Sequence, residues 1–236
     1  MQIIDYSGAN NIQINFPEYN WITKTTYKHF KLGEVKCPYE KRYYGKGYLG
    51  EGCYKMSKNG KLTKEYRLWY NMLIRCYNPD IHNKFPTYIN CEVCDEWLNF
   101  QNFATWYNNN YYTVQNEVMS LDKDILVKGN KLYSPETCIF VPQRINSIFI
   151  KSNSKRGNLP IGVSRCSNSN KFIASCHTIE KYQVVHIGMY DTIIDAFNAY
   201  KLFKENMIKQ LADKYEKYIP KKLYEALYNY KVEIDD

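Results

Sequence analysis

Two cysteines have the spacing that most directly suggests chemistry in this sequence. Cys91 and Cys94 are separated by two residues, as in half of a structural zinc site, where thiolates bind the metal in a tetrahedron. The chain holds eight cysteines, and its start, MQIIDYSGANNIQ, lacks the basic and apolar regions of a secretion signal. We therefore expect reduced thiols, which leaves two alternatives: a zinc site, or free thiols packed as small apolar side chains.

Two enzyme classes lack their sequence signatures. The glycine-rich segment 45–50 is not followed by the Lys-Ser/Thr pair of a phosphate-binding loop, and no cysteine stands in a local nucleophile motif. The sequence therefore favours neither nucleotide hydrolysis nor thiol catalysis. No window approaches the roughly 20 apolar residues of a membrane span, so we expect a soluble protein without a membrane partner.

Basic residues are concentrated in the first third of the chain. The whole chain has a formal net charge of +8, whereas residues 21–75 alone hold 13 Lys and Arg against 4 Asp and Glu. A local surplus of this kind is typical of a surface that contacts phosphate groups, and the alternative is an ordinary solvated basic face. If a nucleic acid is bound, we expect this segment to touch its backbone.

The elements of the first half are predicted from hydrophobic periodicity. Alternating residues such as Ile12–Phe16, punctuated by glycines, indicate a small β module with tight turns. Thr63 can cap a helix that reaches Arg75, because Leu68, Trp69, Met72, Leu73 and Cys76 share one face. A second helix is predicted over 95–107, and Asn108–Asn110 is predicted to be a loop.

The second half reads as two further modules separated by a linker. Leu121–Val127 is predicted as a strand, Gly129-Asn130 as a turn, and the segment through Tyr133 and Cys138 as a second strand or loop before a short helix. The polar run 151–158 is the best linker. Beyond it, strands are predicted at 161–165, 171–175 and near 184–187, followed by a helix capped by Thr192 and Asp195.

The C-terminal pattern resembles the Apetala/ethylene-response-factor (ERF) DNA-binding domain over about 50 residues. The matching segments are Gly162-Val163-Ser164-Arg165, Lys171-Phe172-Ile173-Ala174, Gly188-Met189-Tyr190-Asp191-Thr192 and Asp195-Ala196-Phe197-Asn198-Ala199-Tyr200. Phe172 stands for the usual Trp and Tyr190 for the usual Phe, changes that preserve packing. The resemblance implies a three-stranded sheet that lies in the major groove, braced by a helix.

This resemblance also implies which side chains meet duplex DNA. Arg165, Lys171, Ser175 and His177 would contact DNA from the strands, and Arg156 and Lys181 would contact phosphates. Arginine can pair bidentately with guanine, whereas a lysine at the rim mainly releases counterions. The alternative for Arg165 and Lys171 is that they belong to the solvated face of a half-buried sheet.

A second resemblance, to HNH-type endonucleases of phages and mobile elements, runs over about 75 residues of the centre. Its anchors are Met72-Leu73-Ile74-Arg75-Cys76-Tyr77-Asn78-Pro79, Val93-Cys94-Asp95-Glu96-Trp97, Phe100, Phe103, Leu121-Asp122-Lys123-Asp124, Tyr133-Ser134-Pro135-Glu136-Thr137-Cys138 and Gln143-Arg144-Ile145-Asn146. Proteins of this type are often joined to an ERF-type module. The resemblance implies a ββα centre that holds a divalent metal on the scissile phosphate.

The site residues carried over from this family are Asp122 and Asn146, which would hold Mg²⁺ or Mn²⁺ through hard oxygen ligands. Lys123 stands where active members present a histidine base, and Thr137 replaces the asparagine that orients that base. Asp124 would then serve as the base. The alternative is a degenerate scaffold that binds DNA without cleaving it.

Zinc is a second metal that the central segment could hold. Cys76 and Cys138 lie in the anchor segments of the same module as Cys91 and Cys94, so four thiolates could converge on one ion. Free thiols packed in the core remain the alternative.

Taken together, the sequence predicts an α+β protein in three parts: a basic β-rich module at 1–58, an HNH-like ββα centre with flanking helices at 59–150, and an ERF-type domain with a helical extension at 151–236. In the C-terminal ERF-type domain, a three-stranded antiparallel sheet should pack on a helix. We expect a cytoplasmic protein, in a host bacterium if a phage encodes it, that binds double-stranded DNA. Metal-dependent cleavage or nicking and non-enzymatic regulation are the two alternatives for its function; docking of an acidic protein partner is a third.

Overall fold

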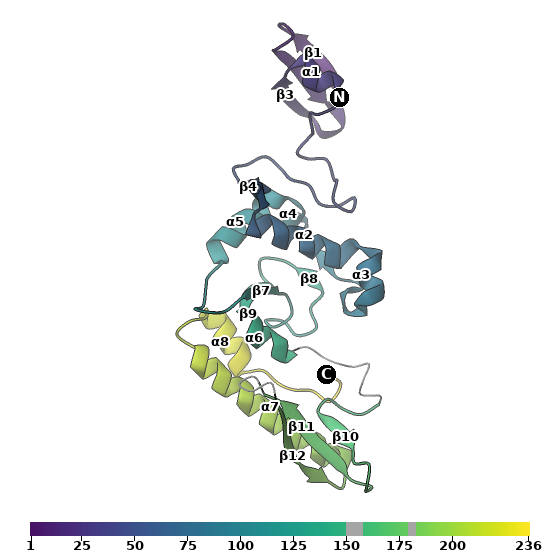
Figure 1. Ribbon diagram of the computed structural model, residues 1–236, viewed down its shortest axis with the longest axis vertical. Helices are drawn as coiled ribbons and strands as arrows, with labels where there is room; N and C mark the ends of the chain where they lie inside the picture. Colours follow the sequence, from purple (N-terminus) through teal and green to yellow (C-terminus); the bar gives the residue numbers. More distant parts are fainter. Residues whose placement is uncertain (150–157, 179–182) are drawn as a thin grey trace. The chain divides into compact units, whose positions relative to one another are not determined.

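The structure, a computed structural model, describes residues 1–149, 158–178 and 183–236 (Figure 1). The fold mixes helices and strands, as the sequence predicts. Contacts within the chain divide it into two units. The first comprises Met1–Asn110 and Lys131–Pro135, and the second comprises Tyr111–Asn130 and Glu136–Asp236.

The first unit begins with the predicted β module. Strands β1 (Gln2–Tyr6), β2 (Ile12–Phe16) and β3 (Trp21–Thr25) form an antiparallel sheet in chain order, with the short 3-10 helix η1 (Pro17–Tyr19) before β3. Ile12 and Ile14 are fully buried, so the alternation along β2 sets which face is covered. Helix α1 (Tyr27–Lys31) follows; Thr26 Oγ1 accepts a hydrogen bond from the His29 N–H at 3.2 Å.

Helix α2 (Lys64–Tyr77) confirms the predicted cap and most of the predicted apolar stripe. Thr63 Oγ1 accepts from the Tyr66 N–H, and the face that contains Trp69, Met72, Leu73 and Cys76 is buried. The preceding hairpin of β4 (Ser57–Lys58) and β5 (Lys61–Leu62) turns at an Asn-Gly pair, whose two residues both have positive φ. This is the turn chemistry that two-residue hairpins favour.

The rest of the first unit is built from short elements. They are α3 (Pro79–Lys84), η2 (Pro86–Tyr88), β6 (Glu92–Val93), α4 (Asp95–Leu98), α5 (Phe100–Asn110) and β8 (Leu132–Tyr133). Strand β8 pairs in parallel with β6.

Two details of the predicted second helix are wrong. The helix is interrupted at Asn99, because the backbone of Tyr48 bonds to Leu98 O and to the Phe100 N–H, both at 2.9 Å. Asn108 and Asn110 are helical rather than loop residues. Their side-chain amides donate to backbone carbonyls four residues earlier, at 2.7 and 2.9 Å, and so extend the last turn.

The second unit contains two strands and a short helix in the predicted order, but its second strand begins after Cys138, whereas Tyr133 lies in β8, which pairs with β6 in the first unit. Strand β7 (Met119–Asp122) pairs antiparallel with β9 (Ile139–Pro142), and α6 (Gln143–Asn146) and η3 (Ser147–Phe149) follow. The first strand ends at Asp122 and not at Val127, because Asp122 Oδ1 accepts the N–H groups of Asp124 and Ile125 and turns the chain.

The C-terminal sheet confirms the predicted three antiparallel strands packed on a helix (Figure 1). Its strands are β10 (Val163–Arg165), β11 (Phe172–His177) and β12 (Val184–Tyr190), and its helix is α7 (Ile193–Tyr215). Val163, Ala174 and Cys176 face Ala196, Phe197 and Tyr200 in the buried cluster between sheet and helix. Thr192 caps α7 as predicted, accepting from the Asp195 N–H at 3.1 Å.

The second half of α7 and helix α8 (Lys221–Tyr228) cover the antiparallel pair of β7 and β9, here called the hairpin of the second unit. Ile139 and Val141 of β9 and Ile145 of α6 share a core with residues of α7 and α8, among them Ile208 and Leu223. Residues 111–130 and 136–149 therefore belong with the C-terminal segment, and the boundary expected near residue 150 does not coincide with the one between the two units. An amphipathic helix buries its apolar stripe against a neighbouring apolar surface.

Candidate functional site

The loop after β7 holds the predicted metal ligand Asp122. Asp122 is half-buried, and its Oδ1 accepts hydrogen bonds from Asp124 N at 2.9 Å and Ile125 N at 2.7 Å. Burial, reinforced by the nearby charge of Asp124, raises the pKa of Asp122 to about 6. The loop thus holds a carboxylate that is costly to ionise without a compensating cation.

Lys123 lies inside this loop and not on its surface. The residue is 7% exposed, and Nζ donates to Asn130 O at 2.7 Å and to Asp124 Oδ2 at 3.3 Å. Asn130 returns a hydrogen bond from its side-chain amide to Lys123 O at 2.7 Å, which closes the loop. The sequence gives one signal for this pair of hydrogen bonds between Lys123 and Asn130, namely the Gly129-Asn130 turn. Asn130 is not among the predicted site residues.

The other predicted catalytic residues lie around the same hairpin. Asp124 is exposed next to Lys123, and Thr137 is half-buried just before β9. Asn146 ends α6, which packs against both β7 and β9. The structure therefore brings Asp122 and Asp124 directly together and places Thr137 and Asn146 on elements of the same unit.

The four cysteines predicted for zinc are divided between the two units. Cys76 and Cys91 are buried and Cys94 is half-buried in the first unit, whereas Cys138 is buried in the second. The Cys91 thiol donates to Thr87 O at 3.7 Å. Among the residues that the structure describes, no three His, Cys, Asp or Glu side chains form a group that could hold a metal ion. Zinc binding therefore stays a prediction.

The outward face of the C-terminal sheet includes two of the predicted DNA-contacting residues. Strand register places Ser175 and His177 on the face opposite α7, because the intervening residue Cys176 is buried against the helix. The same register adds residues that we did not predict, namely Ser164, Ile173, Val184, His186 and Met189. Strand alternation could have identified them once the pairing of β12 with β11 was known.

Arg165 and Lys171 have different environments. Arg165 is paired with Phe172 across β10 and β11, and its guanidinium lies 5.2 Å from the centroid of that ring, which packs against the core under α7. Arg165 thus lies at the edge on the helix side of the sheet. Lys171 immediately precedes β11 and lies 3.2 Å from the exposed carboxylate of Asp191. Arg156 and Lys181 lie outside the described residues.

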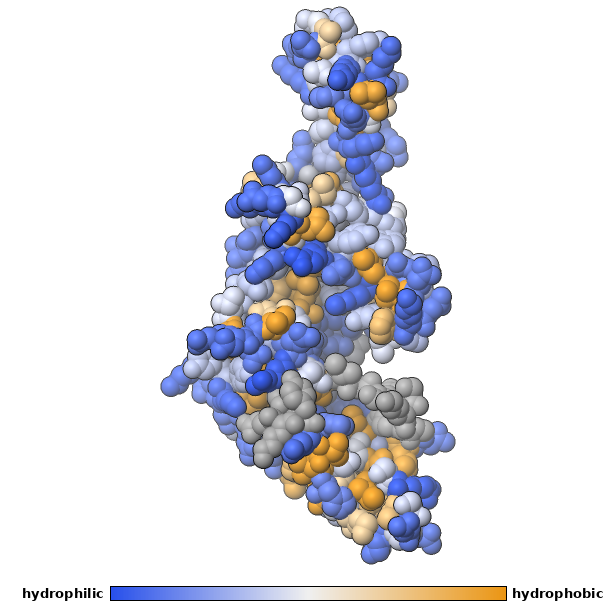
Figure 2. Space-filling view, viewed as in Figure 1, coloured by the Kyte–Doolittle hydropathy of each residue, from blue (hydrophilic) through white to orange (hydrophobic). Residues whose placement is uncertain are grey.

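The basic segment 21–75 exposes nearly all of its positive charge. All ten of its lysines, together with Arg42 and Arg67, are exposed. Its carboxylates are largely engaged: Glu40 pairs with Arg42, and Glu51 accepts from Trp21 Nε1 and the Tyr39 hydroxyl, both at 2.8 Å. These two hydrogen bonds lower the pKa of Glu51. Figure 2 shows mainly hydrophilic side chains on the visible face of the N-terminal part.

Comparisons of the chain with protein-family models, with curated proteins and with solved structures found no match. Across residues 1–149, 158–178 and 183–236, no helix has both the length and the apolar character needed to cross a bilayer.

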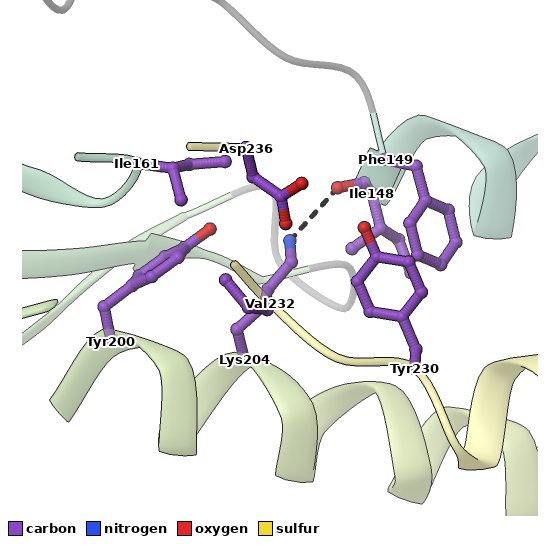
Figure 3. A pocket seen from close by; sticks show the side chains of 8 residues that line it. All are labelled: Ile148, Phe149, Ile161, Tyr200, Lys204, Tyr230, Val232 and Asp236. Carbon is purple, nitrogen blue, oxygen red and sulfur yellow. Dashed lines mark hydrogen bonds between the residues drawn. The ribbon is translucent and has the colours of Figure 1, made fainter. Parts of the chain in front are cut away.

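A small cavity in the second unit surrounds a buried lysine (Figure 3). Lys204 of α7 is 8% exposed, and its Nζ donates to Ile148 O at 3.1 Å. Tyr200, Tyr230 and Asp236 also line the cavity, whose volume of about 20 Å³ has room for a single water molecule and not for a substrate. Burial lowers the pKa of Lys204, and its position indicates a structural role.

We expect Lys204→Met to stabilise the protein at pH 7 by on the order of 1 kcal/mol, because it removes a buried charge. The pKa of Lys204 is lower in the folded state than in the unfolded state. At pH values between these two pKa values, the unfolded state therefore binds more protons than the folded state. Wild-type stability therefore rises relative to the variant as pH approaches about 10.5. Urea unfolding of both proteins from pH 7 to 10 checks this; a difference that does not change with pH would contradict it.

Proposed function

We propose that this protein binds duplex DNA and cleaves or nicks it with a bound divalent metal ion. DNA binding is supported most directly by the exposed lysines of residues 21–75, whose positive charge is only partly balanced by engaged carboxylates. Such a surface attracts a phosphate backbone and releases counterions on binding. Ser175 and His177 on the outward face of the C-terminal sheet offer hydrogen-bonding groups toward base edges.

The cleavage proposal rests on the loop of Asp122 and Asp124. A half-buried carboxylate with a pKa of about 6, next to a second carboxylate, would be stabilised by a divalent cation, which would compensate both negative charges. Mg²⁺ and Mn²⁺ prefer oxygen ligands, and Mg²⁺ is commonly held by one or two carboxylates while it keeps several waters. The oxygen donors of Asp122 and Asn146 suit such an ion in chemical type, and these two residues are the proposed ligands.

When bound, the ion would supply Lewis-acid stabilisation of charge on the scissile phosphate. The chain's own residues orient this site. The two backbone hydrogen bonds to Oδ1 fix the Asp122 carboxylate, so that Oδ2 is free of these contacts. Asp124 is exposed and can accept a proton from an attacking water, and the Lys123 ammonium holds it near the loop at 3.3 Å.

A second candidate function is DNA binding without cleavage, as in a regulator. It is favoured by Lys123, which occupies the place of the histidine base in the family that the centre resembles. Its ammonium group donates to Asn130 O and to Asp124, and a protonated amine cannot accept a proton from water. Under this alternative, β7, β9 and α6 form a structural scaffold for DNA binding and take no part in catalysis.

Two measurements test the proposal. Fluorescence anisotropy with a labelled duplex at several salt concentrations should show log affinity falling linearly with log salt. Incubation with supercoiled plasmid in Mg²⁺ or Mn²⁺ should then give nicked or linear DNA. DNA binding without nicking would exclude cleavage and favour the second candidate function, that of a non-enzymatic regulator. An affinity that does not change with salt concentration would overturn the proposal that the protein binds DNA.

Neutralising Lys24, Lys28 and Lys36 together, each to Gln, should lower the steepness of this salt dependence. If all three contact phosphates, the slope of log affinity against log salt falls by about 2.7. The control is a triple change of Lys217, Lys221 and Lys222 to Gln, which removes the same charge from exposed positions in the second unit. Equal effects of the two triple variants would show that only net charge matters and that the N-terminal segment is not the contact.

A further inference from the structure

Three tyrosines form a stacked row that runs from the core of the first unit to its surface, here called the tyrosine platform. Tyr66 and Tyr70, one turn apart on α2, are stacked with ring centroids 6.2 Å apart and planes 2° apart. Tyr44, from the preceding loop, continues the row over Tyr70 at 6.5 Å and 27°. Exposure rises along it, from 8% at Tyr66 to 36% at Tyr44. The row thus ends in an aromatic ring accessible to solvent.

Tyr44 is held in a backbone conformation that bulky residues rarely adopt. Its φ is +55°, in the left-handed region, and the next residue, Gly45, has φ +67°. A non-glycine residue in this region costs free energy, and such strain tends to be found where a side chain serves a function. A glycine at position 44 would fit this backbone better, so the backbone itself does not require the tyrosine ring.

The loop that carries Tyr44 is firmly anchored. Tyr43 and Gly47 exchange backbone hydrogen bonds at 3.2 and 2.9 Å, and Gly47 is buried against Trp69 and Leu73 of α2. The Tyr43 hydroxyl accepts from Tyr66 at 3.1 Å. The Asn78 amide donates to the Tyr44 hydroxyl at 3.4 Å. The position of the exposed ring is therefore set before any ligand binds, which lowers the entropy cost of stacking on it.

The surroundings of the tyrosine platform are positively charged. Lys41 and Lys46 lie on either side of Tyr44 in the sequence of this loop, and both are exposed. In the described part of the chain, no carboxylate pairs with Lys41 or Lys46. Glu40 is engaged by Arg42. An exposed aromatic face beside unpaired cations is complementary to a base and its phosphates.

We propose that the tyrosine platform binds an unpaired base of a DNA strand, with Tyr44 stacking on the base and Lys41 and Lys46 contacting the adjacent phosphates. The faces of paired bases in a duplex are covered by their neighbours, so only a base that has left the stack can reach Tyr44. This inference rests on the proposed function, and it adds a site for locally opened or single-stranded DNA to the duplex contacts.

The test uses the full chain and fluorescence anisotropy with a labelled single strand of about 16 nucleotides and with the same sequence as a duplex. Tyr44→Gly should weaken single-strand binding about 10-fold. Its duplex affinity and melting temperature should stay close to wild type, since the glycine relieves backbone strain. Tyr44→Phe, which keeps the ring, should bind the single strand as the wild type does. Tyr218→Ala, which removes a tyrosine that is 62% exposed in the second unit, should have no effect.

The outcomes separate this inference from the function on which it rests. Wild-type single-strand affinity in Tyr44→Gly, or no single-strand binding by the wild type, would overturn the tyrosine platform, whatever the duplex result. If the wild type does not bind the duplex but binds the single strand, and if that binding requires the ring of Tyr44, the proposed duplex function is overturned and the tyrosine platform is supported. An equal loss in Tyr44→Phe and Tyr44→Gly would show that the ring does not stack on a base, which also overturns it.

Discussion

Replacing Asp122 with Asn is expected to abolish metal-dependent nicking of plasmid DNA, with a rate loss of at least about 100-fold. The variant keeps a side-chain oxygen that can accept the Asp124 and Ile125 N–H groups, so the loop after β7 is preserved. What it removes is the negative charge that would hold the cation. Gel analysis of supercoiled plasmid in Mg²⁺ or Mn²⁺ measures the effect.

The matched control is Asp213→Asn, which neutralises an exposed carboxylate on α7 of the same unit and should nick as the wild type does. Asn146→Ala should reduce nicking as well, because it removes the second proposed ligand. Duplex affinity, measured by anisotropy, should be retained in all three variants. If Asp122→Asn nicks plasmid as fast as the wild type does, the assignment of the metal site is overturned. If the wild type and all three variants bind DNA without nicking it, the non-enzymatic regulator is favoured.

The same substitution predicts a change in the pH dependence of stability. The pKa of Asp122 is raised from 3.8 to about 6 in the folded state, so the folded protein binds more protons in this window than the unfolded chain. Wild-type stability relative to Asp122→Asn should therefore fall as pH rises from about 4 to about 6. At pH 7 the variant should be the more stable by on the order of 1 kcal/mol. Urea unfolding at several pH values checks the sign.

Local signals in the sequence predicted much of the fold. The caps at Thr63 and Thr192 and the alternation in β2 each depend on neighbouring residues, and each is present in the structure. The errors arise where distant parts of the chain intervene. Asn99 ends a helix because Tyr48 binds its neighbours through the backbone, a contact that no local pattern encodes.

The candidate site was less predictable, for the same reason. The sequence shows a lysine at position 123, but the burial of this lysine depends on Asn130, which binds it across the loop. Lysine is rarely buried without partners, and a sequence does not show where the partners lie. Arg165 was predicted on the outward face, yet it alternates in phase with the buried Val163. The stacking of Tyr44 on Tyr70 joins a loop to a helix and also requires tertiary structure.

Gly162→Ala is expected to destabilise the second unit by about 3 kcal/mol. Gly162 precedes β10 with φ +78°, a conformation that alanine adopts only at a cost. In addition, a Cβ at this position would overlap the ring of Tyr200, which is 4% exposed and packs in the core between the C-terminal sheet and α7. The ring cannot move aside without opening that core. Thermal unfolding followed by circular dichroism measures the loss.

Gly129→Ala separates the two causes. Gly129 has φ +77°, nearly the same as Gly162, but no heavy atom of the described residues, apart from Gly129 and its two chain neighbours, lies within 4 Å of its added Cβ. Its substitution should therefore cost only the backbone term, about 1 kcal/mol. The difference between the two variants then measures how tightly Tyr200 closes on the chain before β10. Equal losses would mean that the contact with Tyr200 contributes nothing, and that the requirement for glycine at position 162 is set by backbone conformation alone.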